Sequence, residues 1–274
     1  MDYRIEQVKT DHDSLLEVRD LLKLVFEKRA DKFSYSYLKW LYSDNPAGRV
    51  VGFNAYYKDL LVAHYATMPI YMIIAGRKTL GLLSLNTATH PDHRGRGLFI
   101  KLAEQTYDFA SLNGYRYVIG VANANSIHGF IQYLGFKLVG PLSFKIGLGD
   151  NLYCGVSHLY SRYWDKDLLA WRLNNPSMSY YKNGEMVVSP IIGGFKKMVF
   201  HDSNNLLSLR KLYGRPFNLY IGFGADLSKG IYCDVPKIIK RSPFNLIFRD
   251  MTDGELPEMS KSNTLFELID FDVA

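Results

Sequence analysis

The most regular hydrophobic pattern of the chain lies between residues 79 and 112. Residues 79–89 are mostly apolar or β-branched, which is typical of a strand buried on both faces. Pro91 ends this strand because proline has no N–H to donate. Farther along, apolar side chains recur every three or four residues, which predicts a helix over 98–112. The pattern therefore places a strand just before a helix, with a short turn rich in glycine and arginine between them.

The rest of the first half alternates between helical and strand-like patterns. Ser14 and Glu17 have the spacing of a capping box, which predicts that a helix starts there. Asn45 and Pro46 end the next helical segment, because the residue before a proline disfavours the helical conformation. This order predicts a mixed α/β fold. The further elements that we expect are strands at 3–8, 50–57, 60–68, 70–74 and 117–121, and helices at 34–43 and 126–133.

Composition narrows the class of protein. The chain has 274 residues, 47% apolar and 22% charged, which is an ordinary globular mix for one large domain or two small ones. Its net charge of +6 suits an anionic ligand, while the lack of a dense Lys/Arg run argues against nucleic acid. The two cysteines form no metal-binding pattern, so no metal is expected. A charged N-terminus and the lack of an apolar run of ~20 residues predict a cytoplasmic protein without membrane insertion.

The turn before the predicted helix has the chemistry of an anion site. It reads Arg94-Gly95-Arg96-Gly97. A glycine-rich turn at a helix start leaves backbone N–H groups unpaired, and the helix dipole adds partial positive charge there. Such a site binds phosphate or pyrophosphate, and the two arginines add charge-assisted hydrogen bonds. A basic turn without a ligand remains the alternative, because neither G-x-x-x-x-G-K-[ST] nor G-x-G-x-x-G is present.

The turn and the start of the helix resemble motif A of the GNAT superfamily, the GCN5-related acyl-CoA N-acyltransferases. The family loop reads [RQ]-x-x-G-x-[GA] and precedes a helix. Phe99 stands where the family has a small residue, which predicts a reshaped wall beside the pantetheine arm. The resemblance implies acyl-CoA as co-substrate. It assigns acyl-CoA binding to Thr87, Ala88, Thr89, Arg94, Gly95, Arg96, Gly97, Leu98 and Phe99.

Residues 115–140 resemble motif B of the same family. They read as a strand, an asparagine loop, a short helix and then Leu134-Gly135-Phe136. In the family the two central strands splay apart, and acyl-CoA lies between them. The resemblance adds Asn125, Ser126 and Phe130 to the cofactor residues. The family tyrosine that protonates the departing thiolate is replaced by Ile131, and we do not assign its role to Tyr133.

The second half repeats the first in outline. Residues 169–176 echo residues 38–46, since both segments contain a tryptophan and end at Asn-Pro before hairpin-like strands. We expect a GNAT catalytic domain at 1–148 and a β-rich domain at 149–274, a degenerate GNAT-like repeat that has lost the glycine-rich loop. Chance similarity is the alternative. The elements expected here are a link at 147–151, strands near 195–200, 217–223, 244–250 and 264–272, and a helix at 204–213.

The arrangement of both halves resembles bacterial N-acyltransferases that act on nucleotide-linked amino sugars. Thr89-His90-Pro91 and Phe271-Asp272-Val273 carry part of this resemblance. It implies acyl transfer to a dTDP-linked amino-dideoxy sugar, for O-antigen or surface-polysaccharide synthesis, by direct attack in a ternary complex. The N–H of Thr87 would hold the oxyanion. The catalytic residues expected are Thr87, His90 and Asn125, and the substrate-binding residues are Asn45, His64 and Asn123.

Two other functions stay open on the sequence. One is a GNAT that acylates another amine, such as an aminoglycoside, a polyamine or a lysine side chain. The basic character of the chain argues mildly against the cationic acceptors among these. The other is an acyl-CoA-binding module without activity, suggested by Ile131 in place of the family tyrosine. A homodimer is also left open.

Overall fold

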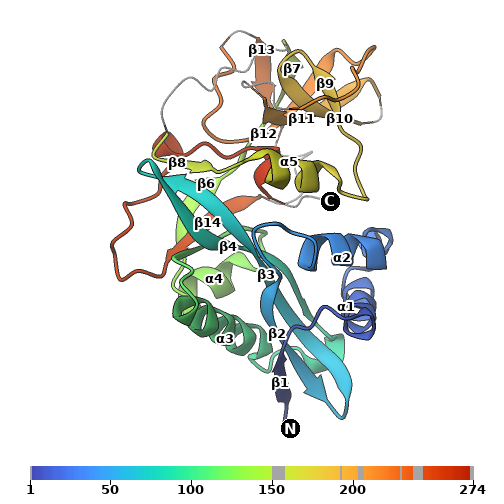
Figure 1. Cartoon of the computed structure of the whole chain (residues 1–274), viewed down its shortest axis with the longest axis vertical. Coiled ribbons are helices and arrows are strands. Elements are labelled where there is room, and N and C mark those ends of the chain that lie inside the picture. The colour runs from blue at the N-terminus through green and yellow to red at the C-terminus, as the bar shows by residue number, and fades with distance from the viewer. Residues whose placement is uncertain are drawn as a thin grey trace.

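The computed structural model describes residues 2–149, 158–191, 193–202, 207–228, 230–236 and 243–271. These residues fold into two mixed β-sheets with five α-helices (Figure 1). In spatial order the first sheet contains β1 (Arg4–Gln7), β2 (Val51–Tyr57), β3 (Leu60–Ile74), β4 (Arg77–Thr89), β5 (Tyr117–Ala122), β14 (Asn245–Asp250) and β6 (Lys137–Pro141), with β8 (Tyr160–Arg162) on β3. The second contains β13 (Ile231–Asp234), β7 (Ser143–Leu148), β12 (Phe217–Gly222), β11 (Phe195–His201), β10 (Met186–Pro190) and β9 (Tyr181–Asn183). The expected α/β fold with a second β-rich region is confirmed.

Four helices cover the two faces of the first sheet. α1 (His12–Val25) and α2 (Tyr35–Tyr42) pack on one face, and α3 (Leu98–Leu112) and α4 (Ile127–Tyr133) pack on the other (Figure 1). The α1–α2 face shares one continuous apolar core with the second sheet and with α5 (Lys166–Leu173). The α3–α4 face has a separate core. The central strands of the first sheet are therefore covered on both sides, as their apolar sequences predicted.

Two local predictions need correction. The strands expected at 60–68 and 70–74 are one strand, β3, because its ladder to β4 continues across Pro69. The helix α1 is capped by Asp11 and not by Ser14, since the Asp11 carboxylate accepts a hydrogen bond from the Ser14 N–H at 3.1 Å. The helix starts at His12, so Ser14 lies inside its first turn. By contrast, α3 has the bounds that the apolar pattern predicted.

Each sheet contains strands from both halves of the chain. β7 follows β6 in sequence but pairs with β12 and β13 in the second sheet. β14 follows β13 in sequence but lies between β5 and β6 in the first sheet. The expected boundary at residue 148 therefore does not separate two continuous sheets. The expected link at 147–151 begins inside β7, and residues 150 and 151 lie outside the described residues.

The two sheets share a pattern of strand pairing, which supports the expected repeat. In the first sheet β3 pairs antiparallel with β4, and β4 pairs parallel with β5. In the second, β10 pairs antiparallel with β11, and β11 pairs parallel with β12. The copy is incomplete, because no helix is formed in 207–213, where one was expected; residues 203–206 lie outside the described part. Residues 264–271 contain a short 3₁₀ turn rather than the expected strand, and Asp272 and Val273 are not described.

The two repeated helices, α2 and α5, pack against each other through their tryptophans. The Trp40 Nε1 donates to the Trp171 carbonyl at 2.8 Å, and the Trp171 Nε1 donates to the Trp40 carbonyl at 2.9 Å. The two rings stack with centroids 5.1 Å apart, and both residues are buried. This reciprocal contact joins the two halves of the chain.

We expect Trp171→Ala to lower the free energy of unfolding by about 3–5 kcal/mol, because it removes a large buried ring and the indole N–H that donates to the Trp40 carbonyl. Equilibrium denaturation in urea measures this change. Trp171→Phe is the matched control, since it keeps most of the ring and loses only the N–H, at a cost of about 1 kcal/mol. An alanine variant no less stable than the phenylalanine variant would contradict this role.

Candidate active site

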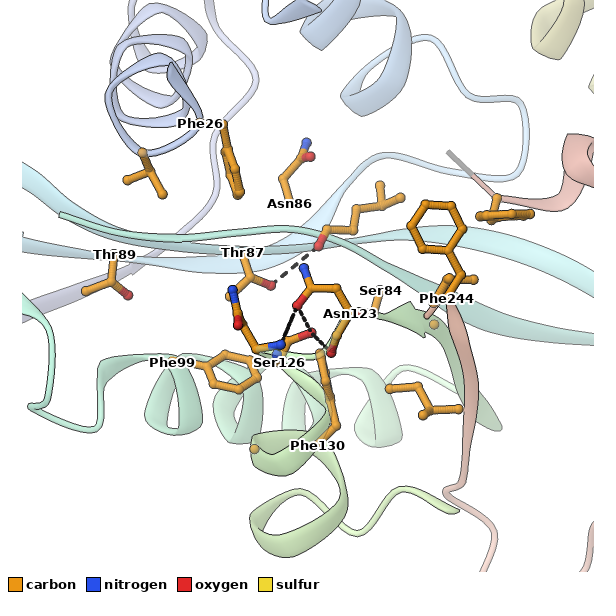
Figure 2. A pocket seen from close by; sticks show the side chains of 18 of the residues that line it. Phe26, Ser84, Asn86, Thr87, Thr89, Phe99, Asn123, Ser126, Phe130 and Phe244 are labelled. Atoms are coloured by element: carbon orange, nitrogen blue, oxygen red, sulfur yellow. Dashed lines mark hydrogen bonds between the residues drawn. The ribbon is translucent and has the colours of Figure 1, made fainter. Parts of the chain in front are cut away.

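A cavity of about 710 Å³ opens where β4 and β5 separate. The parallel pairing of the two strands ends at Ser84 and Gly120, yet β4 continues to Thr89. The cavity extends to both sides of β4: Figure 2 shows Phe26 and Asn86 on one side and Phe99 and Phe130 on the other. The splayed strands that the resemblance implied are therefore present.

A β-bulge lies in β4 at the same place. Tyr65 of β3 pairs with Thr87, and Thr67 pairs with Ser84, so that two residues of β4, Leu85 and Asn86, face the single residue between them on β3. A bulge interrupts the ladder and re-aims a side chain. The regular β3–β4 ladder is thus interrupted at the border of the cavity. The interruption lies next to Thr87, whose N–H is the expected oxyanion donor.

The arginine-glycine turn forms one end of the cavity. Arg94 and Gly95 line it, followed by Phe99 on the first turn of α3. Gly95 and Gly97 both have φ of 71°, and no atom lies within 4 Å of the place where a Cβ would stand on either. Glycine is favoured at such φ values, and the open space beside it leaves room for a phosphate group. Gly97 is the N-cap of α3, so the helix dipole points to this turn.

The start of α4 forms the adjoining wall. The Asn123 Oδ1 accepts hydrogen bonds from the N–H groups of Asn125 at 2.9 Å and Ser126 at 3.1 Å. Phe99 meets the ring of Phe130 edge-on, with centroids 5.1 Å apart. Gly129 makes this contact fit, because a Cβ there would lie 2.7 Å from the Phe99 ring. All six residues line the cavity, and all but Gly129 were expected site residues.

The other end of the cavity is aromatic and cationic. It is lined by residues from α1, from the 3₁₀ turn η1 (Glu27–Lys32) and from the C-terminal half: Val25, Phe26, Arg29, Lys32, Phe33, Phe244 and Phe271. Burial lowers the pKa of Lys197 on β11, and the nearby ammonium of Lys32 lowers it further. None of the described residues that line the cavity is acidic.

Three expected site residues serve the scaffold instead. His64 is fully buried, its pKa is lowered to about 3 by burial, and both ring nitrogens are hydrogen-bonded within the core. Asn45 is buried at a turn, where its amide donates to the Pro69 carbonyl and accepts from the Ala47 N–H. Neither His64 nor Asn45 lines the cavity, and the polar atoms of both side chains are used within the scaffold. The Oδ1 of Asn123 is likewise committed to the α4 turn, although this residue does line the cavity.

Other expected residues lie at the margin of the cavity. The Nδ1 of His90 accepts from the Asp92 N–H at 3.3 Å, which caps the turn after β4, and His90 does not line the cavity. Ala88 and Leu98 are buried in the apolar cores. Arg96 and Gly97 continue the turn beyond the lining residues. The assignment of these residues to acyl-CoA remains a prediction.

Sequence reasoning missed Asn86 and the cationic end. Asn86 carried no signal, because regular alternation would place it on the same face of β4 as Leu82, whereas the bulge turns it to the opposite face, where it contacts Tyr42. Arg29 and Lys32 carried none, since they lie in a short 3₁₀ turn without a periodic pattern. Ile131, at the position of the family tyrosine, packs against the α3–α4 core and does not line the cavity.

No helix in the described part of the chain is long and apolar enough to cross a membrane. Among the described histidines, cysteines and acidic residues, no group of three or more is placed to hold a metal ion.

Comparison with known proteins identifies the fold around this cavity. Residues 8–139 match the family model of the acetyltransferase (GNAT) domain. A probable N-acyltransferase of unknown function from Enterococcus faecalis V583 has a TM-score of 0.61 and 12% identity, covering 91% of this chain and 73% of that chain. Eis1 from Mycobacterium abscessus has a TM-score of 0.57 and 12% identity, covering 92% of this chain and 74% of that chain. A GCN5-related N-acetyltransferase from Kribbella flavida has a TM-score of 0.55 and 12% identity, covering 92% of this chain and 72% of that chain.

A search of the curated proteins found no match. At such low identity the solved structures show a shared fold, and the likeness extends over both sheets of this chain. The family match is independent of that likeness and covers the segment that holds β4, the arginine-glycine turn and α3. Residues 8–139, just under half of this chain, are therefore similar to the GNAT acetyltransferase domain family.

Proposed function

We propose that this protein is an acyl-CoA-dependent N-acyltransferase whose acceptor is the amino group of a nucleotide-linked amino-dideoxy sugar. The observation that carries the proposal is the cavity itself. On one side of β4 the cavity contains an open glycine turn at a helix N-terminus, which suits a pyrophosphate. On the other side of β4 it is lined by aromatic and cationic side chains. Acyl-CoA would enter on the α3–α4 side, and the acceptor would lie between Phe26 and Phe271.

The reaction would be a direct transfer. The amine nitrogen attacks the thioester carbonyl, a C–N bond forms, the nitrogen loses one proton to water, and the C–S bond breaks to release the CoA thiolate. The oxyanion of the tetrahedral intermediate would be held by backbone N–H beside the bulge, with that of Thr87 as the leading candidate. Holding both substrates in one cavity supplies much of the rate enhancement. Asn125 and Ser126 would contact the pantetheine arm from α4.

The charge of the acceptor end supports an anionic acceptor. Arg29 and Lys32 line it, and the second half adds Lys197 beside Lys32. Two ammonium groups held close together repel each other, and a bound diphosphate would relieve that repulsion. Aromatic side chains at the same end offer faces for a base or a sugar. A polycationic acceptor such as a polyamine would find no carboxylate among the described lining residues.

A ligand screen tests the proposal. CoA and dTDP should each raise the melting temperature, and together they should raise it further, because ligands of the native state stabilise it by mass action. Release of CoA thiol should then require both acyl-CoA and the nucleotide-linked amino sugar. Stabilisation by CoA without thiol release for any amine would favour the non-catalytic module. Thiol release with an aminoglycoside or polyamine alone would favour the other GNAT acceptors.

We expect Lys32→Ala to raise the acceptor KM about 10-fold by removing a charge-assisted hydrogen bond to the phosphate. The KM for acyl-CoA should stay unchanged, because Lys32 follows α1 and Arg94 precedes α3, and these two helices pack on opposite faces of the first sheet. Steady-state kinetics with each substrate varied in turn measures both values. Lys28→Ala is the control, since Lys28 is an exposed cation of the same turn outside the cavity. Equal effects of the two variants would argue against an anionic acceptor.

A further inference from the structure

Asn86 is the polar side chain that the bulge of β4 exposes on the acceptor side of the cavity. It lines the cavity, and Figure 2 shows it on the same side of β4 as Phe26. The amine must approach the thioester from this side. A side chain at this point therefore lies beside the reacting atoms of the proposed function, on which the following inference rests.

A chain of buried hydrogen bonds holds the Asn86 amide. Its Nδ2 donates to the Tyr42 hydroxyl at 2.9 Å. The Tyr42 hydroxyl lies 2.8 Å from the His64 Nε2, and the His64 Nδ1 lies 2.7 Å from the Asn54 Oδ1. Tyr42 and His64 are fully buried, and Asn54 is 2% exposed. Such a chain is rigid, because any break would leave a polar atom unpaired in the core.

The chain has a single direction. The Asn54 Oδ1 can only accept, so His64 carries its proton on Nδ1 and its Nε2 accepts from the Tyr42 hydroxyl. At the outer end the Asn54 amide donates to the Tyr56 hydroxyl at 3.5 Å, which donates to the Glu17 carboxylate at 3.1 Å. A carboxylate accepts only, so it fixes the direction of every donor behind it. Burial keeps His64 neutral, since its pKa is lowered to about 3.

The direction of the chain decides which amide atom of Asn86 is left for a ligand. Its Nδ2 is used by Tyr42, and no described residue donates a hydrogen bond to its Oδ1. An amide oxygen accepts from the N–H of an amine and leaves the nitrogen lone pair free to attack. The nitrogen gains positive charge during attack, so this hydrogen bond strengthens toward the transition state.

We propose that the Oδ1 of Asn86 orients the acceptor amine for attack on the thioester, and that Tyr42, His64 and Asn54 are positioning residues that hold this amide in place. Asn86 is then a catalytic residue because it touches the reacting amine. The buried chain acts only through it. The role of His64 in catalysis is therefore indirect, in contrast to direct contact with the substrate.

A double-mutant cycle tests this proposal. Asn86→Ala should lower kcat/KM for the acceptor about 100-fold, mostly through kcat, because the amine loses its alignment. Tyr42→Phe should lower it about 10-fold, since the amide remains but is free to turn. The double variant should be no slower than Asn86→Ala alone, because Tyr42 acts through Asn86. The KM for acyl-CoA should be unchanged in all three variants.

The control is Tyr160→Phe, which also removes a hydrogen-bonded hydroxyl from the core, where it donates to the Pro257 carbonyl. This variant should lose stability and keep the wild-type kcat. Its comparison with Tyr42→Phe separates the loss of amine alignment from a general loss of stability of the core. A kcat/KM of Asn86→Ala within threefold of wild type would overturn the proposal. Fully additive effects of Asn86→Ala and Tyr42→Phe would overturn the positioning role of the buried chain.

The amine panel separates this proposal from the proposed function. If the wild-type protein acylates an amine other than a nucleotide-linked sugar, the proposed acceptor is wrong, and the same cycle measured on that amine still decides the role of Asn86. If it acylates no amine while acyl-CoA raises its melting temperature, the transferase function and the role of Asn86 are both overturned.

Discussion

Replacing Gly97 by glutamate is expected to abolish acyl-CoA binding in a protein that still folds. Gly97 caps α3 with φ of 71° beside open space, at the turn that would receive the pyrophosphate. A carboxylate there would occupy the anion site and repel the phosphates. We expect the dissociation constant of CoA to rise at least about 100-fold, which corresponds to about 2.8 kcal/mol. Titration calorimetry with CoA measures it.

Gly114→Glu is the matched control for this variant. Gly114 follows the other end of α3, has φ of 79°, and also has no atom near the place of a Cβ. Both substitutions therefore carry the same backbone strain of about 1–2 kcal/mol. Gly114→Glu should lose stability like Gly97→Glu and bind CoA like wild type. Equal CoA affinity in the two variants would show that the turn does not bind the pyrophosphate.

The sequence predicted the structure most accurately where a single physical cause controls the local conformation. The bounds of α3 followed from its apolar spacing, with Gly97 before it and Asn113 after it. The resemblance to motif A implied that Arg94, Gly95 and Phe99 contact the ligand, and all three line the cavity. Such features depend on neighbours in sequence, which the pattern of residue types records directly.

The sequence was least informative where the surroundings of a side chain depend on distant parts of the chain. His64 has the chemistry of a base, but its partners Tyr42 and Asn54 lie on other elements, and only the fold brings them to both ring nitrogens. Asn86 was overlooked because a bulge, which arises from the register between β3 and β4, turned it into the cavity. A residue type alone therefore does not distinguish a ligand from a core hydrogen bond.

The exchanged strands show the same limit at the level of the fold. An apolar strand such as β14 would fit the centre of either sheet, and its sequence does not determine which strands it pairs with. The exchange ties the halves together: β14 completes the sheet that holds the cavity, and Phe244, just before it, lines the acceptor end. The second half therefore contributes structure to the candidate site, beyond a wall for the acceptor.

We expect a fragment of residues 1–148 to show no cooperative unfolding, although it contains the whole segment that matches the GNAT family model. It lacks β14, whose Leu246 and Ile247 are fully buried and whose Phe248 is 5% exposed. Burial of three such side chains contributes roughly 5–9 kcal/mol, about as much as the whole stability of many domains, which is roughly 5–15 kcal/mol. Denaturant unfolding followed by circular dichroism measures the transition.

A joined fragment supplies the control, because β14 lies directly beside the end of β6. The Leu142 N–H donates to the Phe244 carbonyl at 2.7 Å, so a two-residue Asn-Gly turn can connect residues 1–142 to residues 244–256 as a hairpin. This joined fragment restores both ladders of β14 within one short chain and should recover a cooperative transition. Its stability should remain below that of the full protein, because Trp40 loses Trp171. Cooperative unfolding of the fragment without β14 would instead show that the first half is complete without the exchanged strand.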